Sequence, residues 1–147
     1  LNEICLNQEF IDLKIRTMEI ADHVSKIAKQ KNIRDHILKI QHSLGKKTSI
    51  VMDGRDIGTV VFPNAKFKFF LSASPKLRAK RRFDEMKRNG VDVKYDEVLK
   101  NLIIRDNDDI NRVHSPLKIA DDAVKINTEN LSLDELENII LKIIKKS

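Results

Sequence analysis

One stretch of sequence decides the fold: an apolar run followed at once by glycine and charge, Ser49-Ile50-Val51-Met52-Asp53-Gly54-Arg55-Asp56-Ile57-Gly58-Thr59-Val60-Val61-Phe62-Pro63. A short apolar, β-branched run is typical of a buried strand, and Gly-rich exits from such strands are where α/β sheets meet ligands. Asp53, Arg55 and Asp56 lie within four residues at the carboxyl end of this run. The stretch therefore predicts an α/β sheet with a charged ligand site at its edge.

Strand-like and helix-like patterns alternate along the rest of the chain. Residues 1–11 look irregular, and Gly45 and Gly90 are expected to stop helices. We expect helices over residues 16–30, 32–44, 75–89, 95–112 and 132–144, and strands over 48–53, 66–72 and 124–127. Such alternation is typical of a mainly parallel sheet, and the first two helices are expected to form a small separate lobe.

Composition narrows the class of protein. The chain has 147 residues, 41% of them hydrophobic and 34% charged, which is typical of a folded globular chain. We find no apolar run approaching ~20 residues and no signal peptide, so we expect no membrane association. The single Cys5 is consistent with a reducing compartment, and we expect a cytoplasmic monomer.

The net charge of +6 suits a nucleic acid, a membrane surface or a phosphorylated small molecule. Aromatic residues make up only 5% of the chain and tryptophan is absent, whereas nucleic-acid surfaces often interleave aromatic and basic side chains. The arginines stand beside aspartates instead. This arrangement favours a compact anionic ligand that carries a polar base.

Three ordered motifs resemble those of bacterial cytidylate kinases. The segment Asp53–Pro63 resembles the family's DGRDxGTVVFP motif, Arg78-Ala79-Lys80-Arg81-Arg82 is similar to its lid entry, and Arg105–Arg112 resembles its R-D-x-x-D-x-x-R segment. The resemblance runs nearly end to end. It implies the fold of a P-loop nucleoside monophosphate kinase, with a mainly parallel sheet, a helical nucleotide-binding lobe and a short lid.

The resemblance also implies an activity and a division of the chain. The activity is phosphoryl transfer from ATP to CMP or dCMP, giving ADP and CDP or dCDP, with Mg²⁺ bound alongside ATP. We expect residues 1–46 to be the remainder of the monophosphate-binding lobe, 47–80 the core strands and a helix start, 81–104 the lid region and 105–147 the C-terminal part of the core.

Helical spacing places Arg105, Asp109 and Arg112 on one face. Two arginines around an aspartate could hold phosphate oxygens, with the carboxylate orienting a guanidinium or accepting from a sugar hydroxyl. Spacing alone equally allows a solvated face with intrahelical salt bridges. The resemblance assigns these three positions to the ribose and phosphates, with Arg105, Arg112 and Arg55 as the catalytic charges.

The remaining site residues are assigned by resemblance. Asp56 would accept from the exocyclic amine of cytosine, while Ser25 and Arg34 would donate to its ring nitrogen and carbonyl. Arg55 would hold the CMP phosphate. Asp53 would face magnesium through water, and a turn or helix-capping aspartate is the alternative there. Without the resemblance, Ser25 and Arg34 would be interpreted as structural.

The lid is predicted from the basic cluster that contains Arg81 and Arg82. The resemblance implies that an arginine from this cluster closes over ATP, without indicating which one. The alternative is a solvated basic face with no ligand.

The phosphate-binding loop G-x-x-x-x-G-K-[ST] is absent from these 147 residues. Gly45-Lys46-Lys47-Thr48 ends in a similar way, but Ile40 stands where the first glycine is required. We therefore expect the first strand and the loop to precede Leu1, and the isolated chain to be inactive. Two alternative hypotheses are a basic RNA-associated binding module and a catalytically inactive kinase remnant.

Overall fold

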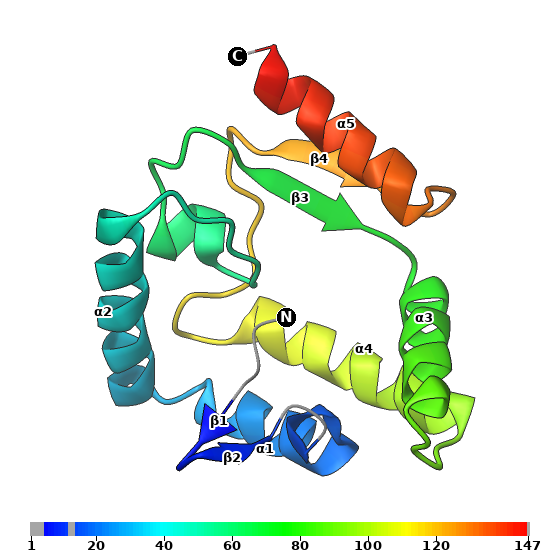
Figure 1. The fold of residues 1–147 in the computed structure, drawn as a ribbon. Helices are drawn as coiled ribbons and strands as arrows, with labels where there is room; N and C mark the ends of the chain where they lie inside the picture. The colour runs from blue at the N-terminus through cyan, green and yellow to red at the C-terminus, as the bar shows by residue number, and fades with distance from the viewer. Residues whose placement is uncertain (1–4, 12–13, 147) are drawn as a thin grey trace.

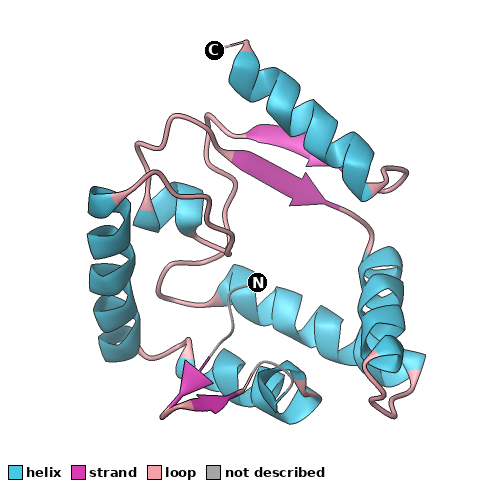
Figure 2. Cartoon of the chain, in the orientation of Figure 1, coloured by secondary structure: helices cyan, strands magenta, loops and turns pink. Residues whose placement is uncertain are grey.

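The computed structural model describes residues 5–11 and 14–146, and the side chains of Arg16, Met18, Ala21, Asp22 and Ser25 fall outside this description. Figure 1 shows the order of the elements in space, and Figure 2 distinguishes helices from strands. The elements are β1 (Cys5–Leu6), β2 (Glu9–Phe10), the 3₁₀ turn η1 (Lys14–Arg16), α1 (Met18–Ile27), α2 (Lys31–Lys47), the π-helical turn η2 (Ile57–Val61), β3 (Phe69–Ser72), α3 (Pro75–Arg88), α4 (Tyr95–Asn111), β4 (Val124–Asn127) and α5 (Leu133–Lys145).

The parallel pairing that the sequence predicts is present. β3 and β4 pair in parallel from Phe69 opposite Val124 to Ser72 opposite Asn127. The two strands lie beside each other below α5 in Figure 1. A connection through α3 and α4 separates them in sequence, as a parallel pair requires. The structure is therefore mixed α/β with a small parallel sheet.

Two sequence predictions about strands are wrong. Residues 48–53 form no strand, because no other strand of the described chain pairs with them and Val51 is fully exposed. A strand exists through its ladder of hydrogen bonds, and an apolar run does not supply the partner. Residues 5–10, expected to be irregular, form the antiparallel hairpin β1–β2, whose turn residues Asn7 and Gln8 have positive φ as a tight hairpin turn demands.

Local capping signals fix the ends of two helices as predicted. Ser74 caps α3 by accepting from the Leu77 amide at 3.3 Å, and Pro75 occupies its first position. Gly90, with φ of 76°, follows the end of α3. A capping box between Ser132 and Glu135 opens α5. These signals act within a few residues, which is why sequence alone located them.

Gly45 does not stop α2, contrary to the sequence prediction. The helix continues to Lys47, and Thr48 ends it by turning to an extended backbone. A Cβ atom at Gly45 would lie 2.6 and 2.7 Å from two carbons of the Phe62 ring. Gly45 therefore allows close packing of α2 against the Phe62 ring, and a larger residue would require that ring to shift.

The best-packed part of the core lies between α3 and α4. Ala79 and Met86 of α3 and Val98 of α4 are buried there, and partly buried neighbours such as Phe83 and Tyr95 surround them. The Phe83 and Tyr95 rings meet edge to face with centroids 6.1 Å apart. α3 and α4 therefore form one packed arm, hereafter the α3–α4 arm. The division of the chain into four functional ranges stays a prediction.

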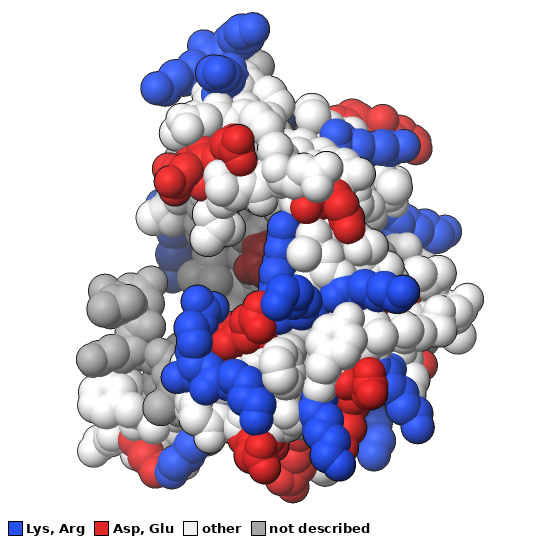
Figure 3. Space-filling view, turned by 90° about the vertical axis from the view of Figure 1, so that its right-hand side faces the viewer, with Lys and Arg blue, Asp and Glu red and all other residues white. Residues whose placement is uncertain are grey.

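The outer face of α3 carries charges of both signs. In Figure 3, lysine and arginine side chains alternate with aspartate and glutamate instead of forming a continuous basic surface. Ion pairs such as Lys80–Asp84 and Lys87–Asp92 account for part of this mixture. In the described residues, none of the helices has the length and apolarity needed to cross a membrane.

The α3–α4 core generates a stability prediction. Val98 is 1% exposed and Val113 is 88% exposed. Val98→Ala should lower the free energy of unfolding by about 1.5–2.5 kcal/mol, because two buried methyl groups are lost and a cavity is left. The same change at Val113 should stay within about 0.5 kcal/mol. Urea denaturation of the 147-residue chain measures both, and equal effects would contradict this description of the core.

Candidate nucleotide site

A buried carboxylate brings together three distant parts of the chain. Asp56 is 8% exposed. Its Oδ2 accepts from a terminal nitrogen of Arg34 on α2, and its Oδ1 lies 3.5 Å from a terminal nitrogen of Arg112, directly after α4. Neither partner is near Asp56 in sequence. The Gly-Arg-Asp segment, α2 and the end of α4 therefore converge on one charged group.

A second carboxylate extends the arrangement. Asp109 on α4 accepts from Arg55 Nε at 2.9 Å through Oδ2 and from Arg112 at 3.3 Å through Oδ1. The five side chains alternate in sign as Arg34, Asp56, Arg112, Asp109 and Arg55, hereafter the arginine–aspartate chain. Three positive and two negative charges leave one net positive charge. The cluster is nearly neutral and still attracts an anion.

The arginines of the arginine–aspartate chain have nitrogens that make no hydrogen bond in the described residues. Arg34 Nε is buried and makes no hydrogen bond within the described residues, and the Arg112 terminal nitrogen that lies 3.5 Å from Asp56 is buried with this ion pair but no hydrogen bond. The Arg112 side chain is 6% exposed. Burial, followed by the positive charge of Arg34, lowers the pKa of Arg112, whereas Asp56 and Asp109 act to raise it. Buried donors without acceptors are costly, so a bound oxyanion would stabilise this site.

Local backbone structure explains how Arg112 reaches this position. The sequence predicted that α4 includes Arg112, but the helix ends at Asn111 and Arg112 is extended. Its Nε donates to the carbonyl of Ser115, a residue with φ of 51°. The Leu117 amide then donates to the Asp109 carbonyl at 2.7 Å. A tight turn after α4 therefore returns the chain and holds Arg112 against Asp109. In the sequence, Ser115-Pro116 indicated only the end of the helix, and the contact of Ser115 with Arg112 was not predicted.

Asp56 is placed by the turn that it starts. Its carbonyl accepts from the amides of Thr59, Val60 and Val61 at 3.3, 2.8 and 3.2 Å. These bonds begin the π-helical turn η2, and such turns are frequent at functional sites. The carboxylate is thereby directed toward α2 while the backbone of the segment is held in a compact turn.

Arg105 lies in a second basic group, between α3 and α4. It is half-buried, and its positive charge adds to burial in lowering the pKa of Arg82, whose Nε is buried and without a hydrogen-bond partner in the described chain. Nearby, Arg78 forms a two-pronged ion pair with Asp106 at 3.0 and 2.6 Å. Sequence reasoning missed Asp106, because its partner lies 28 residues away.

The two lid candidates differ in their contacts. Arg81 donates to the hydroxyl and the carbonyl of Thr128 at 3.2 and 2.8 Å, which ties α3 to the residue after β4. Arg82 has the unpartnered buried Nε described above. Arg82 is therefore the arginine with a donor to offer.

Asp53 is exposed, and the described residues contain no group of three histidine, cysteine or acidic side chains that could hold a metal ion. A single carboxylate nevertheless fits magnesium, which keeps several waters and is held by one or two carboxylates and substrate phosphates. The Ser25 side chain lies outside the described residues, so its predicted role stays a prediction.

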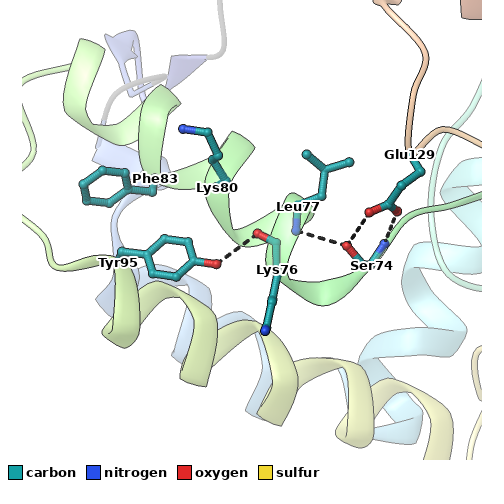
Figure 4. A pocket seen from close by; sticks show the side chains of 7 residues that line it. All are labelled: Ser74, Lys76, Leu77, Lys80, Phe83, Tyr95 and Glu129. Carbon is teal, nitrogen blue, oxygen red and sulfur yellow. Dashed lines mark hydrogen bonds between the residues drawn. The ribbon is translucent and has the colours of Figure 1, made fainter.

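A shallow pocket on α3 is separate from these groups. Figure 4 shows its lining, formed by Ser74, Lys76, Leu77, Lys80, Phe83, Tyr95 and Glu129. None of the predicted site residues whose side chains the structure describes is among them. The Ser74 hydroxyl and amide donate to Glu129 at 2.7 and 2.8 Å and lower the pKa of that carboxyl. The pocket is interpreted as a packing feature between α3 and the loop after β4.

Comparison with known proteins decides the family. A model of the cytidylate kinase family matches residues 1–146. The chain belongs to the cytidylate kinase family. It is similar to the cytidylate kinases of Flavobacterium johnsoniae (46% identity over 97% of the chain), Thermosipho melanesiensis (48% over 96%) and Fusobacterium nucleatum (45% over 96%). It spans 62%, 65% and 65% of the lengths of these relatives. Membership implies the P-loop nucleoside monophosphate kinase fold, which the mixed α/β structure is consistent with.

The arginine–aspartate chain predicts a large effect of neutralising Asp56. Asp56→Asn should lower the free energy of unfolding by about 3 kcal/mol in the absence of nucleotide, because Arg34 and Arg112 lose their shared carboxylate while remaining buried. The control is Asp92→Asn, since Asp92 is fully exposed and its ion pair with Lys87 should contribute less than about 1 kcal/mol. Chemical denaturation measures both, and equal small effects would show that Asp56 is not buried between two arginines.

Proposed function

We propose that the protein containing this chain transfers a phosphoryl group from ATP to CMP or dCMP, giving ADP and CDP or dCDP. The observation that carries this proposal is the arginine–aspartate chain. It unites the DGRD motif with the R-D-x-x-D-x-x-R segment, and in the described residues it leaves Arg34 Nε and the Arg112 nitrogen that faces Asp56 buried without a hydrogen bond. A nucleoside monophosphate supplies what these groups lack, since its phosphate accepts from arginine and its base carries an amine donor.

The proposed roles follow from these contacts. Asp56 accepts from the exocyclic amine of cytosine, using carboxylate lone pairs that Arg34 and Arg112 do not occupy. Arg34, with Ser25, donates to the ring nitrogen and carbonyl. Asp109 accepts from Arg55 and Arg112 and would also accept from a ribose hydroxyl.

Phosphoryl transfer depends mostly on alignment and charge neutralisation. Arg55, Arg105 and Arg112 would neutralise the phosphates, and Arg82 is the favoured lid arginine because its Nε has no partner in the described chain. Mg²⁺ bound with ATP would supply further neutralisation, and Asp53 would face it through water. The short lid would exclude water, whose attack would hydrolyse ATP unproductively.

The base-reading role makes Asp56→Ala the test of substrate choice. Cytosine has an amine where uracil has a carbonyl, so a carboxylate attracts the first and repels the second. Each mismatch leaves buried polar groups unpaired at roughly 1–3 kcal/mol, and together they could give ~10³-fold discrimination. Asp56→Ala should therefore reduce kcat/KM for CMP far more than for UMP. The ratio is the readout because loss of folded protein cancels in it.

This experiment uses the full-length gene product, with Asp92→Ala as the control that keeps the ratio. The 147-residue chain assayed beside it should turn over negligibly, because it lacks the phosphate-binding loop motif. A CMP/UMP ratio that survives Asp56→Ala would exclude Asp56 as the base reader. Absence of CMP kinase activity in the full-length protein, with salt-sensitive RNA binding instead, would support the binding-module hypothesis.

Geometry, and not charge alone, should decide the contribution of Arg112. Its guanidinium contacts Asp109, Asp56 and the Ser115 carbonyl at the same time. Arg112→Lys keeps the charge but cannot reproduce a planar group with several donors. We expect kcat/KM for CMP to fall by roughly 10²-fold or more, as for other single charge-stabilising groups. Steady-state kinetics measure this, and wild-type values in Arg112→Lys would leave Arg112 a purely structural role.

A further inference from the structure

Helix α2 holds the site segment at two places about two turns apart. Arg34 donates to the Asp56 carboxylate near the start of the helix. Farther along, His42 Nε2 lies 2.8 Å from the Val61 carbonyl, and Gly45 packs against the Phe62 ring. Figure 1 shows η2 as the short green helical turn beside α2. The same helix therefore contacts both the start and the end of the π-helical turn.

The contact of His42 satisfies a backbone group that the turn itself leaves open. Carbonyls at the end of a helical turn lack partners within it, and Val61 is the last residue of η2 and 3% exposed. A carbonyl only accepts, so His42 Nε2 carries the proton and donates. The His42 ring also lies against Phe62, with centroids 5.8 Å apart. The imidazole thus fixes both the backbone and the side chain that end the turn.

Gly45 determines how closely this end of the turn can approach α2. With a Cβ atom at 2.6 Å from the Phe62 ring, any other residue would require the ring to shift away from the helix. A shift of Phe62 would be passed along η2 to Asp56, because the Phe62 amide donates to the carbonyl of Ile57, the residue next to Asp56, and the Val61 amide donates to the Asp56 carbonyl. Alanine itself favours a helix more than glycine does, so α2 should remain intact.

We propose that His42 and Gly45 are positioning residues that fix η2 on α2 and thereby set the distance between Asp56 and Arg34 that selects cytosine over uracil. Neither residue reaches the arginine–aspartate chain itself. They act by holding the opposite end of a turn whose first residue is the base reader. The inference rests on the proposed function for its consequence in catalysis, whereas the structural part stands on the contacts above.

The decisive variant is Gly45→Ala, with Ser43→Ala as the matched control because Ser43 is exposed on the same helix. Hydrogen exchange in the full-length protein should speed up at the amides of Val60, Val61 and Phe62 in Gly45→Ala and stay unchanged in Ser43→Ala. In the full-length protein, KM for CMP should rise about ten-fold and the CMP/UMP ratio of kcat/KM should fall, as small displacements of a site do. The double variant Gly45→Ala, Phe62→Leu should recover both, since the clashing ring is removed.

A second pair of variants tests His42 separately. Glutamine places an amide donor near the position of Nε2, so His42→Gln should keep the exchange protection and the CMP/UMP ratio. His42→Ala removes the donor and should lose both. A purely structural role would lower stability in His42→Ala without changing the ratio.

Different results would contradict the positioning role of Gly45 and the proposed function. Unchanged amide exchange in Gly45→Ala, or no recovery in the double variant, would overturn the positioning role whatever the enzyme does. Altered exchange with an unchanged CMP/UMP ratio would equally overturn it, because the turn would then move without affecting base choice. A wild-type protein without preference for CMP would instead reject the proposed function, and the exchange measurements would still decide the contact.

Discussion

The carboxylate of Asp56 is the group on which the candidate site depends. It is buried between two guanidinium groups from different elements, Arg34 on α2 and Arg112 after α4. Removing three charges from water is expensive, and their mutual attraction offsets that cost only when the geometry is good. A buried ion pair therefore contributes little to stability on balance but strongly disfavours any arrangement in which one partner is missing. Asp56 thereby specifies how two halves of the chain meet.

The surrounding structure serves to hold this carboxylate. The π-helical turn gathers three amides on the Asp56 carbonyl, and the turn after α4 directs Arg112 back through Ser115. Ser115 has a left-handed backbone, which costs a residue other than glycine roughly 1 kcal/mol or more and persists where neighbouring contacts enforce it. The π-helical turn η2 and the left-handed backbone of Ser115 are both unfavourable conformations, and they flank the same ion pairs. Such conformations are typical of functional sites.

The sequence predicted what depends on neighbours in the chain and missed what depends on distant ones. The capped start of α3, the capping box of α5 and the parallel β4 were confirmed, because their signals lie within a few residues. The strand over 48–53 was wrong, because pairing needs a partner that an apolar run does not encode. Gly45 was misinterpreted as a helix stop, since its reason is an aromatic ring 17 residues away. Each arginine and aspartate of the site was named through family motifs, whereas spacing alone could not connect Arg34 to Asp56 or Arg55 to Asp109.

Helix α4 connects the packed core of the α3–α4 arm to the arginine–aspartate chain. Its 17 residues span about 26 Å. The first half, including Val98 and Leu102, is packed into the α3–α4 arm, while Asp109 near the far end holds Arg55 and Arg112. A helix packed in this way transmits a tilt along its length. A tilt of the α3–α4 arm would therefore displace Asp109 together with the two arginines that it holds, even though these groups lie at the other end of the helix.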